Sequence, residues 1–119
     1  MPLEQATQVQ FIVKLTDLKR SCRRLLTRLP DEAEAGGQFV VFSATEQTLR
    51  ITAGSTSEGL PAIVLNAGFG KIPNSVFRGI ARTFSTYSAR RIEITFSVGE
   101  MTVDGTVIRH PQITVCGHA

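Results

Sequence analysis

The sequence predicts a mixed α+β fold in which two helices pack on one face of antiparallel sheet. Three observations in the 119-residue chain lead to this prediction. Residues 8–15 alternate apolar and polar side chains, which is the period of a half-buried strand. Residues 16–29 and 74–84 repeat apolar residues at helical spacing instead. Most of the remaining chain consists of short strand-like runs separated by glycine or polar turns, a pattern typical of antiparallel sheets.

The first strand and the first helix follow each other directly. The apolar side of the strand consists of Val9, Phe11, Val13 and Leu15. Thr16 is the expected N-cap of the helix, with Asp17 as an acid in the first turn, and Pro30 ends it. The apolar side of this helix consists of residues three and four apart: Leu18, Cys22, Leu25, Leu26 and Leu29.

Three more strands are expected before the second helix. Residues 31–37 form an acidic loop, 38–44 and 49–53 a hairpin, 54–59 a loop of small and polar residues, and 60–67 the third strand. The polar residues between the hairpin strands favour a tight turn.

The second half begins with a turn over Gly68–Lys71 that leads into a short extended piece. Asn74 is the expected N-cap of the second helix, although Gly79 lowers its intrinsic stability by about 1 kcal/mol. Its apolar stripe consists of Val76, Phe77, Ile80 and Phe84. The closing strands are expected over 91–98, 100–104 and 107–115.

The order β-α-β-β-β therefore occurs twice within one domain spanning residues 1–119, roughly over 8–67 and 68–116. When the second half of the sequence is aligned with the first at an offset of 58 positions, the expected helix caps, core residues and arginines of the two halves coincide. The matched pairs are Thr16 with Asn74, Leu18 with Val76, Cys22 with Ile80, Arg20 with Arg78, and Arg24 with Arg82. We expect a structural duplication.

Composition excludes several classes of protein. Apolar residues make up 42% of the chain, which is enough for a core and too many for a disordered tail. No apolar run approaches the roughly 18 residues needed to cross a bilayer, and the N-terminus shows no secretory signal, so we expect a cytoplasmic protein without membrane contact.

Candidates for catalysis or cofactor binding fail on spacing. Cys22 and Cys116 are far apart, and His110 and His118 have no ligand partners at metal spacing, so no metal is expected. Gly68–Lys71 lacks the remaining residues of a phosphate loop, and no serine stands in a nucleophile elbow. We therefore expect no cofactor and no enzymatic activity.

Basic residues gather on the two predicted helices, within a net charge of +3. At 100° per residue the arginines at 20, 24, 78 and 82 lie opposite the apolar stripes, with Arg23 nearby, Lys19 and Arg28 flanking, and no acid on either outward face. The candidate nucleic-acid-binding residues are Lys19, Arg20, Arg23, Arg24, Arg28, Arg78 and Arg82. Such a surface can contact phosphates by charge alone, and it can equally be an ordinary solvated helix face.

The chain resembles one domain of a DNA sliding clamp, the ring family that includes the bacterial DNA polymerase III beta subunit and the trimeric clamps. The resemblance runs from Phe11 to Val115 and depends on pattern-level segments. These are Phe11–Leu15 before a basic helix, Leu49–Ala53, Lys71–Pro73 before a second helix, and Glu100–Gly105.

In that family each domain is a pair of β-α-β-β-β units whose helices line a central hole over DNA. The resemblance implies a non-enzymatic, processivity-factor-like domain that contacts double-stranded DNA without sequence preference. Clamp rings contain six domains, so a ring would need about six copies, and we expect a homo-oligomer paired through sheet edges. The alternative is a protein-interaction module of the same fold that does not bind DNA.

Overall fold

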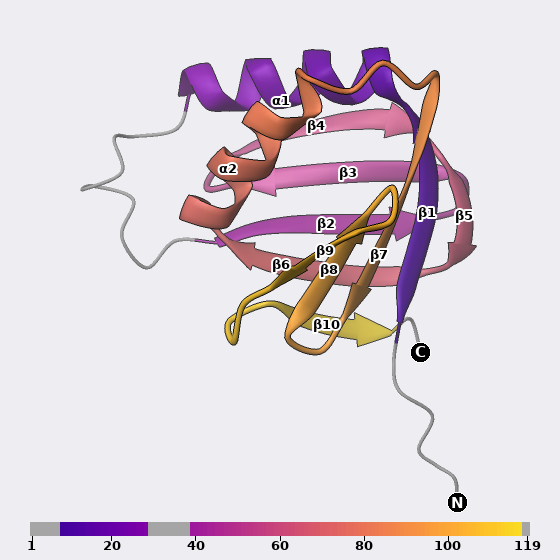
Figure 1. Cartoon of the computed structure of the whole chain (residues 1–119). Helices are drawn as coiled ribbons and strands as arrows, with labels where there is room; N and C mark the ends of the chain where they lie inside the picture. The colour runs from indigo at the N-terminus through magenta and orange to yellow at the C-terminus, as the bar shows by residue number, and fades with distance from the viewer. Residues whose placement is uncertain (1–7, 29–38, 118–119) are drawn as a thin grey trace, which may run out of the picture.

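The structure is a computed structural model that describes residues 8–28 and 39–117. This part of the chain contains two helices and ten strands (Figure 1). The elements are β1 (Val9–Lys14), α1 (Leu15–Arg28), β2 (Phe39–Thr45), β3 (Thr48–Ala53), β4 (Thr56–Pro61), β5 (Ile63–Asn66), β6 (Gly68–Pro73), α2 (Asn74–Phe84), β7 (Arg91–Ser97), β8 (Glu100–Val103), β9 (Thr106–Arg109) and β10 (Thr114–Gly117).

The strands form two five-stranded antiparallel sheets. The first has the order β5-β1-β7-β8-β9 and the second the order β10-β6-β2-β3-β4. Helix α1 runs along β4, and α2 crosses the second sheet near β6 and β2 (Figure 1). The predicted α+β class, with two helices and antiparallel strands, is thus confirmed, and the strands form two sheets.

Phenylalanines from both sheets and α2 meet in the centre of the core. Phe42 of β2 lies 5.2 Å from Phe96 of β7 and 6.2 Å from Phe77 of α2, measured between ring centroids. Phe11 of β1 lies 6.2 Å from Phe96. All four side chains are fully buried, so the two sheets and α2 share one hydrophobic core.

Tight turns join the predicted hairpins. Glu46 and Gln47, between β2 and β3, have φ angles of 47° and 66°, and Asp104 and Gly105, between β8 and β9, have 49° and 90°. Positive φ at both central residues matches the right-handed twist of the flanking strands. The hairpin predicted from residues 38–53 is therefore present, with β2 beginning at Phe39 within the described residues.

Strand β6 and helix α2 begin 59 residues after β1 and α1, one residue more than the predicted offset of 58. Leu15 and Asn74, which begin the helices, are 59 positions apart, and so are Val9 and Gly68, which begin β1 and β6. Leu18 then corresponds to Phe77, and both are fully buried, whereas Val76 is only partly buried. That the halves superpose remains a prediction.

Each half contains one more strand than predicted. Residues 54–59 were expected to be a loop, but Thr56–Pro61 pairs with β3 along its whole length, and this pairing outweighs the weak strand propensity of its small residues. The strand predicted over 60–67 is divided at Ala62, whose N–H donates to the Gln47 carbonyl at 3.0 Å. Residues beyond Ala62 join the other sheet as β5.

The strand predicted over 107–115 is also divided. Pro111 has no N–H to donate, and the Ile113 N–H donates to the His110 carbonyl at 3.1 Å, closing a turn between β9 and β10. The turn expected at Gly68–Lys71 is wrong as well, because these residues form part of β6.

Neither predicted N-cap is in the cap position. Both helices leave their preceding strands directly, so Thr16 lies within α1, and Asn74 is the first residue of α2. The Leu15 N–H donates to the Arg90 carbonyl at 2.9 Å, which satisfies one of the first four amides of α1 that have no partner within the helix. Leu29, Pro30 and the acidic loop lie outside the described residues.

Candidate nucleic-acid interface

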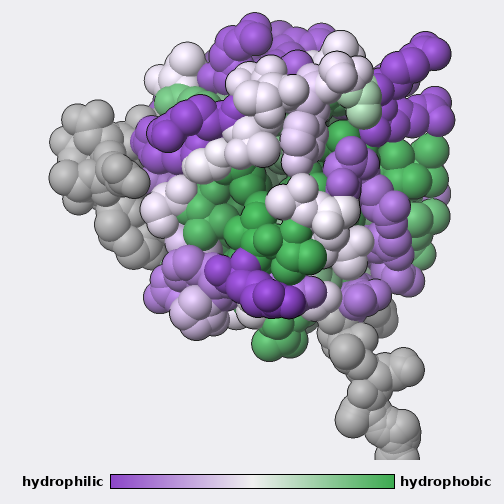
Figure 2. Space-filling model, in the orientation of Figure 1, coloured by the Kyte–Doolittle hydropathy of each residue, from purple (hydrophilic) through white to green (hydrophobic). Residues whose placement is uncertain are grey.

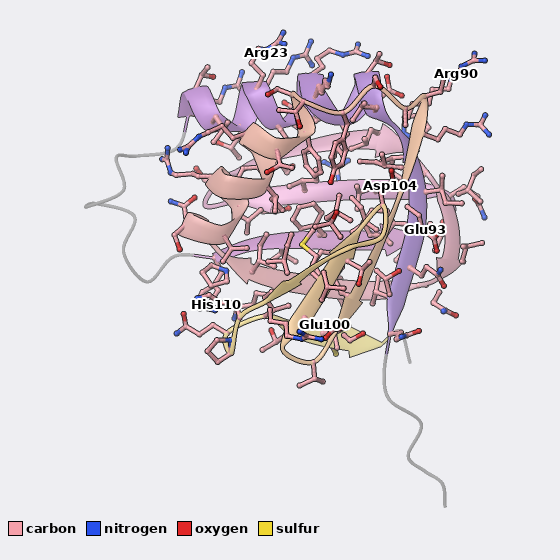
Figure 3. The ribbon with its side chains drawn as sticks, in the orientation of Figure 1. Arg23, Arg90, Glu93, Glu100, Asp104 and His110 are labelled. Carbon is pink, nitrogen blue, oxygen red and sulfur yellow. The ribbon has the colours of Figure 1, made fainter. Side chains whose placement is uncertain are left out.

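Helices α1 and α2 lie next to each other and enclose a shallow groove of about 300 Å³. Lys19, Cys22, Arg23, Leu26 and Thr27 of α1 and Ala81 and Ser85 of α2 line it. Among the described residues that line the groove none is acidic. The exposed side chain of Arg23 projects from α1 away from the sheets (Figure 3).

The cations of α1 divide between two sides of the helix. Arg20 Nη2 lies 2.7 Å from Asp17 Oδ1, and Arg24 Nη1 lies 3.4 Å from Glu58 Oε1 on β4. The expectation that the outward face carries no acid is therefore wrong on this side. Exposed ion pairs of this kind contribute little to stability, but each carboxylate partly neutralises its arginine.

Lys19 and Arg23 lie on the other side, toward α2. Lys19 Nζ donates to the Tyr87 carbonyl at 3.3 Å, which holds its ammonium group close to the end of α2. Arg82, which follows Ala81 in α2, is exposed, and Arg78 is half-buried. The structure thus brings Lys19 and Arg23 to the groove, leaves Arg82 exposed next to the lining residue Ala81, and separates Arg20 and Arg24 from the groove.

Arg28 is exposed in the last turn of α1. A cation there interacts favourably with the negative end of the helix dipole, so its position also has a purely structural explanation.

Three further cations were not selected from the sequence as site residues. Lys14, Arg90 and Arg91 line a cleft of about 780 Å³ at the start of α1, together with Lys19. The available signal was the stretch from Lys71 to Arg91, which contains five basic residues and no acid.

Cys22 is not placed for catalysis. Cys22 is 2% exposed on the core side of α1, and burial raises the pKa of its thiol to about 12, so the nucleophilic thiolate does not form near neutral pH. Across residues 8–28 and 39–117 no group of three or more His, Cys, Asp or Glu side chains is arranged to hold a metal ion. No helix in this part of the chain is long and apolar enough to span a membrane.

Comparison with solved structures finds a match over nearly the whole chain. A crystal structure of a DnaN sliding clamp (DNA polymerase III subunit beta) from Bartonella birtlesii, bound to griselimycin, matches 93% of this chain with a TM-score of 0.55 and 15% sequence identity. The chain therefore has a clamp-like fold. It spans 30% of the length of that clamp chain.

Comparisons at the level of sequence find no such match. No protein-family model matches the chain, and neither does any curated protein.

Proposed function

We propose that this domain binds the backbone of double-stranded DNA, without sequence preference, through the groove between α1 and α2. The observation that carries the proposal is the position of Lys19 and Arg23 in the lining of one groove, with Arg82 exposed beside the lining residue Ala81 and no acidic side chain among the described lining residues. Lysine and arginine bind phosphates by charge and hydrogen bonding and carry no base specificity by themselves. The clamp-like fold supports this assignment.

The remaining candidates have secondary roles in this proposal. Arg28 and Arg78 flank the groove residues along their helices and extend the positive surface. Arg20 and Arg24 contribute less, because each would have to leave a carboxylate before binding a phosphate. Binding requires no chemical step, so the proposed function is non-enzymatic.

Assembly of several copies is part of the same proposal. Each sheet ends in edge strands, β5 and β9 in one and β10 and β4 in the other. Unpaired edges offer N–H and C=O groups to a further strand, and Val107 on β9 exposes 46% of its surface. Edge pairing between copies would extend the sheets, and a ring of six domains would contain six 13.0-kDa chains. A native mass that stays at one chain at high concentration would contradict this.

Salt dependence tests the DNA proposal. Each neutralised phosphate adds about −0.9 to the slope of log affinity against log salt, so Lys19, Arg23 and the neighbouring Arg82 together predict a slope near −3 per domain. Replacing Arg23 and Arg82 with alanine should flatten the slope by about two units on every duplex sequence.

The matched control is the double variant Arg20→Ala, Arg24→Ala, which removes the same charge from the carboxylate-paired side of α1. We expect its slope to change by less than about one unit. The proposal fails if the two double variants behave alike, or if the wild-type protein does not bind duplex DNA even near about 50 mM salt.

A protein-interaction module of the same fold is the second candidate. An apolar groove of about 360 Å³ separates α2 from β8 and β9, and Figure 2 shows hydrophobic side chains gathered at the centre of this face. Its apolar lining includes Val76, Ile80, Phe84, Tyr87, Val103 and Ile108. This candidate predicts no duplex binding at low salt and partner binding that is insensitive to salt.

A further inference from the structure

A second basic cleft lies where β1 passes into α1, outside the groove between the helices. Its volume is about 780 Å³, within the range of small-molecule sites. The lining residues come from β1, the first turns of α1, and the segment between α2 and β7: Lys14, Leu15, Thr16, Lys19, Tyr87, Ser88, Ala89, Arg90 and Arg91.

Four of these lining residues are cations, and no lining residue is acidic. Lys14 and Arg91 lie directly opposite each other in the β1–β7 register, and both are exposed. Like charges at directly opposed positions destabilise a strand pair, so a bound anion would relieve the repulsion. Glu93, two residues along β7, accepts a hydrogen bond from Gln10, and Asp17 in the first turn of α1 pairs with Arg20.

Two hydrogen bonds hold the walls of the cleft together. The Leu15 N–H donates to the Arg90 carbonyl at 2.9 Å, and Lys19 Nζ donates to the Tyr87 carbonyl at 3.3 Å. The segment between α2 and β7 is therefore tied to the start of α1 at two points. Arg90 and Arg23 lie toward the same end of the molecule, away from Glu100 (Figure 3).

The cleft also offers neutral donors. Thr16 and Ser88 have exposed hydroxyl-bearing side chains, and the first-turn amides of a helix carry partial positive charge. Arginine can bind a phosphate through two parallel hydrogen bonds, whereas lysine acts as a compact point charge. Four cations with neutral donors can satisfy more oxygens than a single phosphate group presents.

We propose that this cleft binds a compact ligand that carries two or more phosphate groups. The cations reach it from three segments of the chain around a hollow, a geometry that suits a small polyanion better than the convex side of a duplex. The inference is independent of DNA binding by the helix groove, with which it shares only Lys19. The phosphates could belong to a free polyphosphate or to the 5′-phosphorylated end of a nucleic acid.

Titration with inorganic tripolyphosphate at constant ionic strength tests the proposal. The wild-type protein should bind saturably, and the double variant Lys14→Gln, Arg91→Gln should bind roughly tenfold more weakly or worse. This variant should fold, because it removes a repulsive pair from exposed positions. Tripolyphosphate should raise the Tm of the wild-type protein and not that of the variant.

The control Arg20→Gln, Arg24→Gln removes the same charge from the far side of α1 and should bind tripolyphosphate within about twofold of wild type. Unchanged binding by the Lys14/Arg91 variant, or equal losses in both variants, would overturn the proposal, since the cleft would then attract anions only by net charge. Arg23→Ala, Arg82→Ala should lose DNA affinity and keep tripolyphosphate binding, which separates the two proposals.

Competition identifies the source of the phosphates. A duplex with 5′-phosphates that displaces tripolyphosphate better than the same duplex with 5′-hydroxyls supports a nucleic-acid end as the ligand. Failure of both duplexes to displace tripolyphosphate supports a free polyphosphate, and equally strong displacement by both would overturn the proposal, because the cleft would then bind the duplex backbone.

Discussion

Gly70 of β6 lies directly against the aromatic ring of Phe96 on β7, so a methyl group at position 70 would overlap the ring. Phe96 is fully buried and also packs on Phe42, the residue paired with Gly70 across β2 and β6. The absence of a side chain at Gly70 therefore lets the Phe96 ring of one sheet approach the backbone of the other sheet. This close approach explains why a glycine stands in β6, although the glycine-rich sequence there indicates a turn.

Substituting Gly70→Ala should lower the free energy of unfolding by about 3 kcal/mol, because overpacking a buried site forces a ring or a strand to shift. Urea unfolding of the two proteins measures the difference. A loss below about 0.5 kcal/mol would show that the Phe96 ring can move without cost.

Gly79→Ala is the matched substitution at a glycine without this constraint. Gly79 is exposed within α2, and beyond its chain neighbours and the backbone of its own helix a methyl group there would meet no atom within 4 Å. Alanine has the higher helix propensity, so the same urea experiment should show a gain of about 1 kcal/mol. A decrease in stability would mean that α2 is held in a geometry that the added methyl group disturbs.

Replacing Asn74 with leucine should also stabilise the fold. Asn74 is 3% exposed, and its side-chain nitrogen and oxygen have no hydrogen-bond partner. At the corresponding position, 59 residues earlier, Leu15 begins α1 and is also 3% exposed. Because a buried amide without partners carries a desolvation penalty, we expect Asn74→Leu to raise the free energy of unfolding by about 1–2 kcal/mol. A loss of stability would indicate that the amide has a partner in solution.

The elements that could be predicted from sequence are those with a strong local period. The core sides of the helices were predicted correctly at Leu18, Leu25, Phe77 and Phe84, all of which are fully buried. Strand β4 could not be found this way, because its small residues become a strand by pairing with β3. Local propensity carries no information about that pairing.

The candidate interface shows the same limit. Helical spacing correctly placed the arginines of α1 away from the core, yet it could not show that Arg24 meets Glu58, 34 residues later. That ion pair depends on where β4 packs against α1. Likewise, Lys14 and Arg91 become neighbours only through the register of β1 and β7, so their cleft was not visible in the sequence.

Burial of Cys22 predicts a stability loss in alkaline solution. Burial raises the pKa of this thiol from 9.0 to about 12, so above pH 9 the unfolded chain releases a proton that the folded chain retains. The contribution of this group is therefore constant below about pH 8 and falls as the pH rises from 9 toward 12. The free energy of unfolding of wild type minus that of Cys22→Ala should shrink by at most about 1.4 kcal/mol per pH unit in this range. Urea unfolding of both proteins at several pH values measures this difference, and the subtraction cancels the lysine and tyrosine titration that the two proteins share.

Thiol labelling provides a second measurement, because the folded protein should react at the exposed Cys116 and only the unfolded protein at Cys22. A difference that does not change with pH, together with labelling of Cys22 in the folded protein, would place this thiol in contact with water.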